Sequence, residues 1–152
     1  MNNIISYVQN SKINFADIAE FILEDIFDYS GITLNIIENK KKADSLSTED
    51  IKLSTFLEKC PFPNNYILWV VPGELTPIML CHEMWHLKQY QEERLSISAD
   101  YKKVTFEKKV YDKTTKYEDR PWEIEAFAMQ NRLWKQYKQR LKNKNKCKFK
   151  FW

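Results

Sequence analysis

Apolar residues recur at helical spacing near the N-terminus and then alternate with polar ones. A stripe of apolar positions with gaps of three or four residues predicts an amphipathic helix over residues 15–29, with Asn14 as its N-cap and Gly31 ending it. These positions are Ile18, Phe21, Ile22, Ile26 and Tyr29. The alternation over residues 32–36 predicts a half-buried strand. The polar residues 38–44 are predicted to form a loop.

Two further segments follow this loop. Ser47, with Asp50 three positions later, resembles a capping box and predicts a short helix through Leu57, before the helix-breaking Pro61. Residues 66–71 form a continuous apolar run rich in β-branched and aromatic side chains. Such a run is typical of a well-buried strand.

Two longer helices are marked by proline at their first position. Thr76 is suited to the N-cap and Pro77 to the first helical turn, so we expect a helix that reaches Gln91 or beyond. A second helix is expected to begin at Pro121 and run toward Leu141. Both carry the residues on which the functional argument depends.

The order of these elements predicts one α+β domain. Weak alternation over residues 95–117 indicates one or two short strands between the two long helices. We expect the domain to span residues 1–142, followed by a basic C-terminal tail over residues 143–152. A chain of 152 residues, 43% of them hydrophobic and 14% aromatic, is long enough to bury a single core.

The apolar residues form no run long enough to span a membrane. The first ten residues also lack the charged and then apolar layout of a secretory signal. We therefore expect a protein that works inside a cell, in the cytoplasm.

Basic residues concentrate at the C-terminus. The formal net charge is +3, yet no acidic residue follows Glu125. The basic residues after it are Arg132, Lys135, Lys138, Arg140, Lys142, Lys144, Lys146, Lys148 and Lys150. Such a run can bind an anionic partner such as nucleic acid, a membrane surface or an acidic protein; the alternative is a solvated helix end.

The only two histidines lie four positions apart, as His82 and His86, with Glu83 directly after the first. On a helix, residues at this spacing project from one face, so both imidazoles can reach one tetrahedral metal ion. A catalytic zinc site needs a third protein ligand and an open position for water. No third histidine exists, so the best candidate region for the third ligand is residues 120–128, where a carboxylate lies in the first turn of the second long helix and small alanines would let that helix approach the first closely.

The histidine motif and the glutamates of the second long helix resemble the motifs of the gluzincin metallopeptidases, and in particular those of small zincin-like proteins encoded by bacteriophages. The sequence His82-Glu83-Met84-Trp85-His86 matches the first motif, and Glu123-Ile124-Glu125-Ala126 matches the second. The resemblance implies a zincin-like fold in which the metal-binding helix packs on a second, ligand-bearing helix beside a small sheet. It implies Zn²⁺ bound by His82, His86 and Glu123, with Glu83 as general base; Glu125 is the second candidate for the third ligand.

The resemblance also implies a peptide or protein substrate, and a location in the host cytoplasm or the virion. Zinc chemistry would let Glu83 take a proton from water and deliver it to the leaving amine. Donors for the developing oxyanion are expected among Tyr101, Tyr111, Tyr117 and Arg120. Many relatives place an aspartate that supports the metal site where this chain has Phe127, so a histidine would need support from Asp119 or a backbone carbonyl.

Three functions remain open at this point. The first is zinc-dependent peptide-bond hydrolysis. The second is a non-catalytic protein, structural or virion-associated, in which zinc stabilises the fold; the presence of Glu83 argues against it, since a structural site needs no base. The third is a binding module that uses the basic C-terminal helix and tail.

Overall fold

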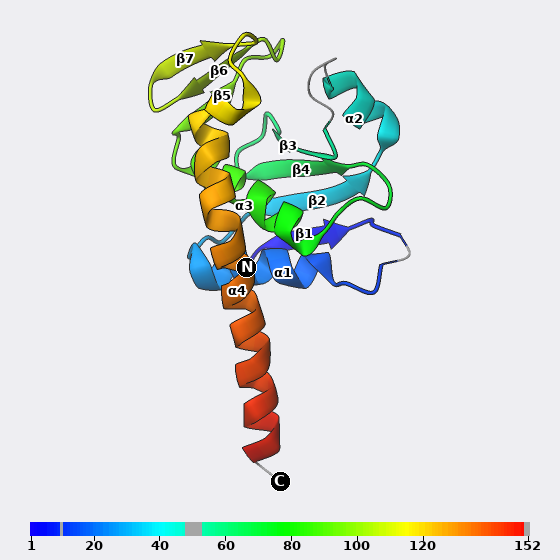
Figure 1. Ribbon diagram of the computed structural model, residues 1–152. Coiled ribbons are helices and arrows are strands. Elements are labelled where there is room, and N and C mark those ends of the chain that lie inside the picture. Colours follow the sequence, from blue (N-terminus) through cyan, green and yellow to red (C-terminus); the bar gives the residue numbers. More distant parts are fainter. Residues whose placement is uncertain (10, 48–52, 151–152) are drawn as a thin grey trace.

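A four-stranded sheet organises the larger part of the chain (Figure 1). The computed structural model describes residues 1–9, 11–47 and 53–150, with side chains through residue 145. The strands lie in the order β1 (Asn3–Ser6), β2 (Thr33–Glu38), β4 (Asn65–Val70) and β3 (Thr55–Lys59). The first three are parallel, whereas β3 is antiparallel to β4 and forms one edge.

One face of this sheet forms the hydrophobic core. Leu34 and Ile36 of β2 and Leu68 and Val70 of β4 are all 0% exposed. They share one cluster with buried residues of α1 (Phe15–Phe21) and α3 (Pro77–Gln91). Helices therefore cover this face of a mixed sheet, and the predicted α+β class is confirmed.

The N-terminal helix begins where the sequence predicts but ends early. The Asn14 side chain accepts a hydrogen bond from the backbone N–H of Asp17 at 3.0 Å, which confirms the N-cap. After α1 the chain continues as a single π-helical stretch, Ile22–Ile26, instead of an α-helix reaching Tyr29. Asp28 has a φ of 58°, a left-handed conformation that no α-helix can contain, so the helical run stops before Gly31.

The structure corrects the predictions for residues 38–57. Helix α2 (Lys40–Leu46) replaces the predicted loop, and the Asn39 side chain caps it by accepting from the N–H of Lys42 at 3.0 Å. Thr55 to Leu57, expected in a helix, belong instead to strand β3. Leu57 pairs with Leu68 of β4 and is buried, so tertiary pairing outweighs the local helix signal. Asp50 of the predicted capping box lies outside the described residues.

Strand β1 was not predicted, because its four residues carry little pattern of their own. It is defined by parallel pairing with β2. The buried Asn2 side chain fixes this pairing: it donates to the carbonyl of Tyr29 at 3.0 Å and accepts from the N–H of Ile32 at 2.9 Å.

Helix α3 follows β4 with the predicted start. The Thr76 hydroxyl accepts from the N–H of Met79 at 3.2 Å, and Pro77 is the first helical residue. A small antiparallel sheet then lies between α3 and the next long helix, in the region where one or two strands were expected. Its strands are β5 (Leu95–Ile97), β6 (Lys103–Phe106) and β7 (Lys109–Asp112).

The long helix α4 (Pro121–Lys150), which follows a 3₁₀ turn (Tyr117–Asp119), packs along α3 and then projects from the rest of the chain (Figure 1). Leu133 and Tyr137 are buried, whereas residues 141–145 are all exposed. The predicted boundary at residue 142 falls inside this helix, so the division into domain and tail stays a prediction. In the described part of the chain, no helix is both long and apolar enough to cross a membrane.

Candidate metal centre

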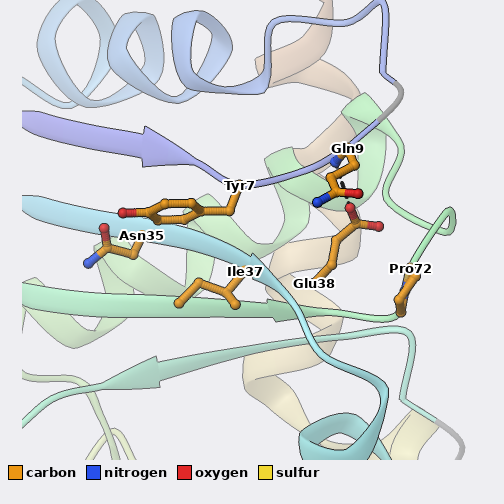
Figure 2. A pocket seen from close by; sticks show the side chains of 6 residues that line it. All are labelled: Tyr7, Gln9, Asn35, Ile37, Glu38 and Pro72. Atoms are coloured by element: carbon orange, nitrogen blue, oxygen red, sulfur yellow. Dashed lines mark hydrogen bonds between the residues drawn. The ribbon is translucent and has the colours of Figure 1, made fainter.

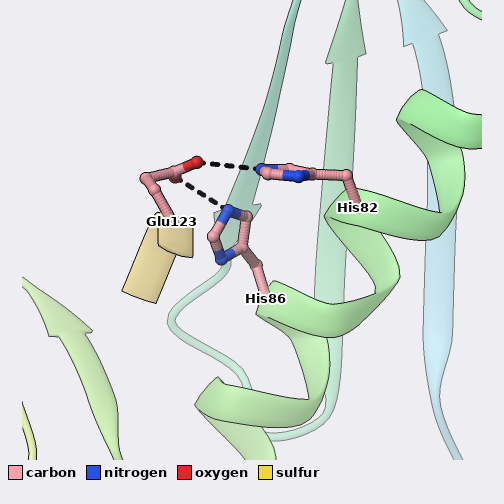
Figure 3. Close-up of side chains that lie close together, drawn as sticks. All are labelled: His82, His86 and Glu123. Atoms are coloured by element: carbon pink, nitrogen blue, oxygen red, sulfur yellow. Dashed lines mark hydrogen bonds and ion pairs between the residues drawn. The ribbon is translucent and has the colours of Figure 1, made fainter. Parts of the chain in front are cut away.

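Three predicted ligands meet where α3 packs against the first turn of α4 (Figure 3). The Nε2 atom of His82 lies 2.9 Å from Oε2 of Glu123, and Nε2 of His86 lies 2.8 Å from Oε1 of the same carboxylate. Their candidate ligand atoms all lie within 4.8 Å of one another. This His–His–Glu group can hold a metal ion.

Local sequence explains why these side chains converge. The helix that begins at Pro77 places His82 and His86 one turn apart on the face toward α4. Ala126, 0% exposed, lets the backbones of α3 and α4 approach closely, and Glu123 lies one turn before it. All three ligands are buried, with exposed fractions of 7%, 7% and 9% for His82, His86 and Glu123.

The buried carboxylate dominates the electrostatics of the cluster. Burial by itself would lower the pKa of His86, but attraction to Glu123 and the hydrogen bond with it raise that pKa to about 9. Burial would raise the pKa of Glu123, yet His86 and His82 hold it well below its usual range. The Glu123 carboxylate therefore keeps its negative charge, and its two oxygens face the Nε2 atoms of His82 and His86.

Glu83 lies beside the cluster, facing the edge of the main sheet. Its side chain is buried, and its Oε1 accepts a hydrogen bond from the hydroxyl of Thr55 on β3 at 2.9 Å. The predicted base is thus held between the metal-binding helix and the edge strand.

Of the four predicted oxyanion donors, Tyr117 is the one that contacts the ligands. Its hydroxyl donates to Oε2 of Glu123 at 2.7 Å, and burial followed by the Glu123 charge raises its pKa. Tyr101 instead donates to Glu58 at 3.4 Å, and Arg120 Nε donates to a backbone carbonyl. Tyr111 packs edge-on against a tryptophan ring.

Glu125, the second candidate ligand, faces away from the histidines. Both of its oxygens accept from the Arg94 guanidinium, at 2.8 and 2.6 Å. Oε1 also accepts from Nε1 of Trp85 at 2.7 Å. Burial would raise the pKa of Glu125, but these hydrogen bonds, that from Arg94 above all, lower it. The same bond to Glu125 raises the pKa of Arg94. The geometry thus brings Glu123, and not Glu125, to the imidazoles.

Two glutamines support the histidines, in place of the expected Asp119 or backbone carbonyl. Oε1 of Gln130 lies 3.0 Å from Nδ1 of His82, and Oε1 of Gln89 lies 2.8 Å from Nδ1 of His86. Sequence reasoning missed both. A spacing signal existed, because Gln89 comes one turn after His86 and Gln130 two turns after Glu123.

Phe127 occupies the position that many relatives give to an aspartate. Its ring packs against that of His82, with centroids 4.6 Å apart, although half of the residue is exposed. The side chain therefore shields one side of the cluster without supplying a polar contact.

A separate hollow of about 640 Å³ lies at the C-terminal ends of the parallel strands (Figure 2). Its residues are Tyr7, Gln9, Asn35, Ile37, Glu38 and Pro72. The only charged group among them, Glu38, already accepts from the backbone N–H groups of Gln9 and Gly73, at 2.6 and 3.0 Å. No predicted site residue lines this hollow.

Comparison of the chain with protein-family models, with curated proteins and with solved structures gave no match. A function for this chain must therefore be argued from its own residues.

The Arg94–Glu125 pair should matter for stability, because both groups are partly withdrawn from water and joined by two hydrogen bonds. We expect Arg94→Met to lower the free energy of unfolding by about 1–2 kcal/mol in urea denaturation. Lys88→Met is the control: it removes a similarly exposed pair, with Glu92 one turn away, that has a single hydrogen bond, and it should cost about 0.5 kcal/mol. Equal losses would show that the doubly bonded Arg94–Glu125 pair contributes no more than the singly bonded Lys88–Glu92 pair.

Proposed function

We propose that this chain is a zinc-dependent peptidase of the gluzincin kind, with a zincin-like fold. The observation that carries the proposal is the buried convergence of His82, His86 and Glu123 between two packed helices. Two imidazoles and one carboxylate are a ligand set found in catalytic zinc sites, where a fourth position is left for water. Structural zinc sites usually close all four positions with protein ligands, often cysteines, so this set favours an enzyme.

The surrounding residues fit the proposed hydrolysis. Zinc held there would supply a Lewis acid and lower the pKa of water to about 7. Glu83, fixed by Thr55, is placed to accept a proton from water and to deliver it to the leaving amine. Tyr117 offers a hydroxyl beside the ligands as a donor to the developing oxyanion.

Strand β3 is the proposed guide for an extended substrate. Strand β4, which leads toward α3, is paired on both sides, whereas β3 is an edge. An edge strand presents unpaired backbone groups that can bind a peptide by strand addition. Because Thr55 of β3 contacts Glu83, a peptide paired along this edge would pass next to the proposed base.

The first test is metal content, measured by plasma mass spectrometry on protein purified without a metal-affinity tag. We expect about one zinc per wild-type chain and loss of that zinc in Glu123→Ala, because Glu123 supplies the only carboxylate of the cluster. Glu125→Ala is the matched comparison: it removes a carboxylate two residues away that contacts neither histidine, so it should still bind zinc when the metal is saturating. Loss of zinc in Glu125→Ala alone would contradict the proposed ligand set.

The second test separates catalysis from metal binding. Glu83→Gln keeps the size of the side chain and an oxygen for Thr55 but cannot accept the proton. We expect normal zinc content and at least a 100-fold lower cleavage rate on a fluorescence-quenched peptide library. The charge-matched control is Glu92→Gln, at the end of α3, which should cleave like wild type. Undiminished cleavage by Glu83→Gln would refute its role as base.

A second function is favoured by the outward side of α4. Leu133, Tyr137 and Arg140 face the rest of the chain, with Arg140 3.4 Å from Asp25 of the N-terminal helical segment. A hollow along the helix defines its basic face, formed by Asn131, Trp134, Lys135, Lys138, Gln139 and Lys142. Trp134 is half-buried at the border of this face, where its ring stacks on Tyr137. The face joins ammonium and amide groups to one aromatic ring, a combination suited to a nucleic-acid backbone. We propose that it binds duplex nucleic acid.

Salt dependence tests this second proposal. We expect a fluorescently labelled 20-bp duplex to bind the wild-type chain, and Lys135→Glu/Lys138→Glu/Lys142→Glu to abolish this binding. Each lost phosphate contact should reduce the slope of log affinity against log salt by about 0.9. The control, Lys40→Glu/Lys41→Glu/Lys113→Glu, makes the same charge change at exposed sites elsewhere. Equal weakening by the two triple variants would indicate a net-charge effect and remove the proposal.

A further inference from the structure

The amide of Gln89 is completely buried between α3 and α4 and makes three polar contacts. Its Nε2 donates to the backbone carbonyl of Trp122 at 3.1 Å and to Oε1 of Glu125 at 3.3 Å. Its Oε1 lies 2.8 Å from Nδ1 of His86. Among the described residues, no other side chain joins the metal-binding helix, the start of α4 and a ligand in this way.

These contacts allow only one orientation of the amide. A carbonyl and a carboxylate can only accept hydrogen bonds, so the NH₂ group of Gln89 must face Trp122 and Glu125. Turning the amide over would place its oxygen against two acceptors inside the core, leaving buried groups without partners. The oxygen of Gln89 therefore has to face His86.

The orientation of the amide in turn fixes the proton on His86. An oxygen acceptor at Nδ1 requires that this nitrogen carry a hydrogen. In a neutral imidazole the lone pair is then on Nε2, the atom directed at Glu123 and at the candidate metal position. Gln89 thus selects the tautomer that metal binding needs.

The acceptor at the far end of Gln89 is itself immobilised. Glu125 is held by the two hydrogen bonds from Arg94 and the one from Trp85. Arg94 Nε also donates to Glu107, at the turn between β6 and β7, at 2.7 Å. The chain of contacts from the small sheet to His86 leaves the glutamine little freedom to turn.

Gln130, the partner of His82, differs in this respect. Its Oε1 lies 3.0 Å from Nδ1 of His82, but the described residues provide no second partner for its amide. The orientation of the Gln130 amide is therefore not imposed by a second contact with the described residues, as that of Gln89 is.

We propose that Gln89 is the positioning residue that sets the tautomer of His86 and thereby directs its Nε2 to the metal. This inference rests on the proposed metal site but not on peptidase activity. It assigns to a buried amide, one turn after the histidine motif, the role that a carboxylate or backbone carbonyl commonly fills beside a metal-bound histidine.

The wild-type protein provides a direct test. Two-bond ¹H–¹⁵N correlation spectra of the zinc-loaded, ¹⁵N-histidine-labelled chain report which nitrogen of each imidazole is protonated. We expect a proton on Nδ1 of His86 and zinc on Nε2, with assignment by comparison with His86→Ala. Zinc on Nδ1, or a wild-type chain that takes up no zinc, would overturn the proposal.

Two substitutions separate positioning from simple packing. Gln89→Glu keeps an acceptor for Nδ1 but loses both donors and opposes Glu125, whereas Gln89→Met loses the acceptor and both donors. We expect the zinc dissociation constant, measured by competition with a chromophoric chelator, to rise about 10–100-fold in Gln89→Met and much less in Gln89→Glu. In urea denaturation Gln89→Glu should be the less stable of the two variants, because two carboxylates face each other in it.

The zinc affinities and stabilities of these variants test the role of Gln89 independently of whether the chain cleaves peptides. Equal loss of zinc affinity in both variants, or loss that follows stability, would show that Gln89 acts only by packing and would refute the inference. Gln130→Met, the matched control at the other histidine, should raise the dissociation constant less than Gln89→Met. If neither Gln89 variant folds, the wild-type spectrum alone decides. Absence of peptide cleavage alters none of these readouts.

Discussion

The burial of one carboxylate, Glu123, constrains the rest of the site. An ionised carboxylate withdrawn from water is strongly unfavourable unless charged or hydrogen-bonding groups surround it. Here two imidazoles and the hydroxyl of Tyr117 supply these partners. Each partner comes from a separate turn or helix, so the contact that satisfies the charge also fixes how α4 begins against α3.

The polar contacts around this carboxylate form two groups, one on each side of the first turn of α4. On one side, Glu123 draws together His82 and His86. On the other, Glu125 is held by Arg94 and contacts Gln89. Gln89 also contacts His86, so the two groups form one connected network. The Arg94–Glu125 pair therefore supports the candidate metal centre through Gln89. The small sheet, which contributes Glu107 to Arg94, is thereby tied to the site although it supplies no ligand.

The sequence predicted the helices that carry the site better than the sheet beside them. Proline at the first position and a threonine cap predicted the start of α3. The four-residue spacing of the two histidines predicted that they lie on one face of this helix. Strands β1 and β3 depend on neighbours distant in sequence, and α2 depends on the Asn39 cap within a run of lysines. Local patterns contain little of that information, because pairing partners determine strand formation as much as intrinsic preference does.

The choice between Glu123 and Glu125 shows where sequence reasoning reaches its limit. Two residues apart on a helix, their side chains point about 200° from each other, so only one can face α3 at the histidines. Which one does so depends on the rotation of α4 about its own axis, and that rotation is set by contacts such as buried Ala126 and Leu133. The Arg94 guanidinium then completes the distinction, because it offers Glu125 a partner that Glu123 does not have. The packing of α4 against α3 therefore decides which glutamate faces the histidines, and the chemistry of the two identical side chains does not.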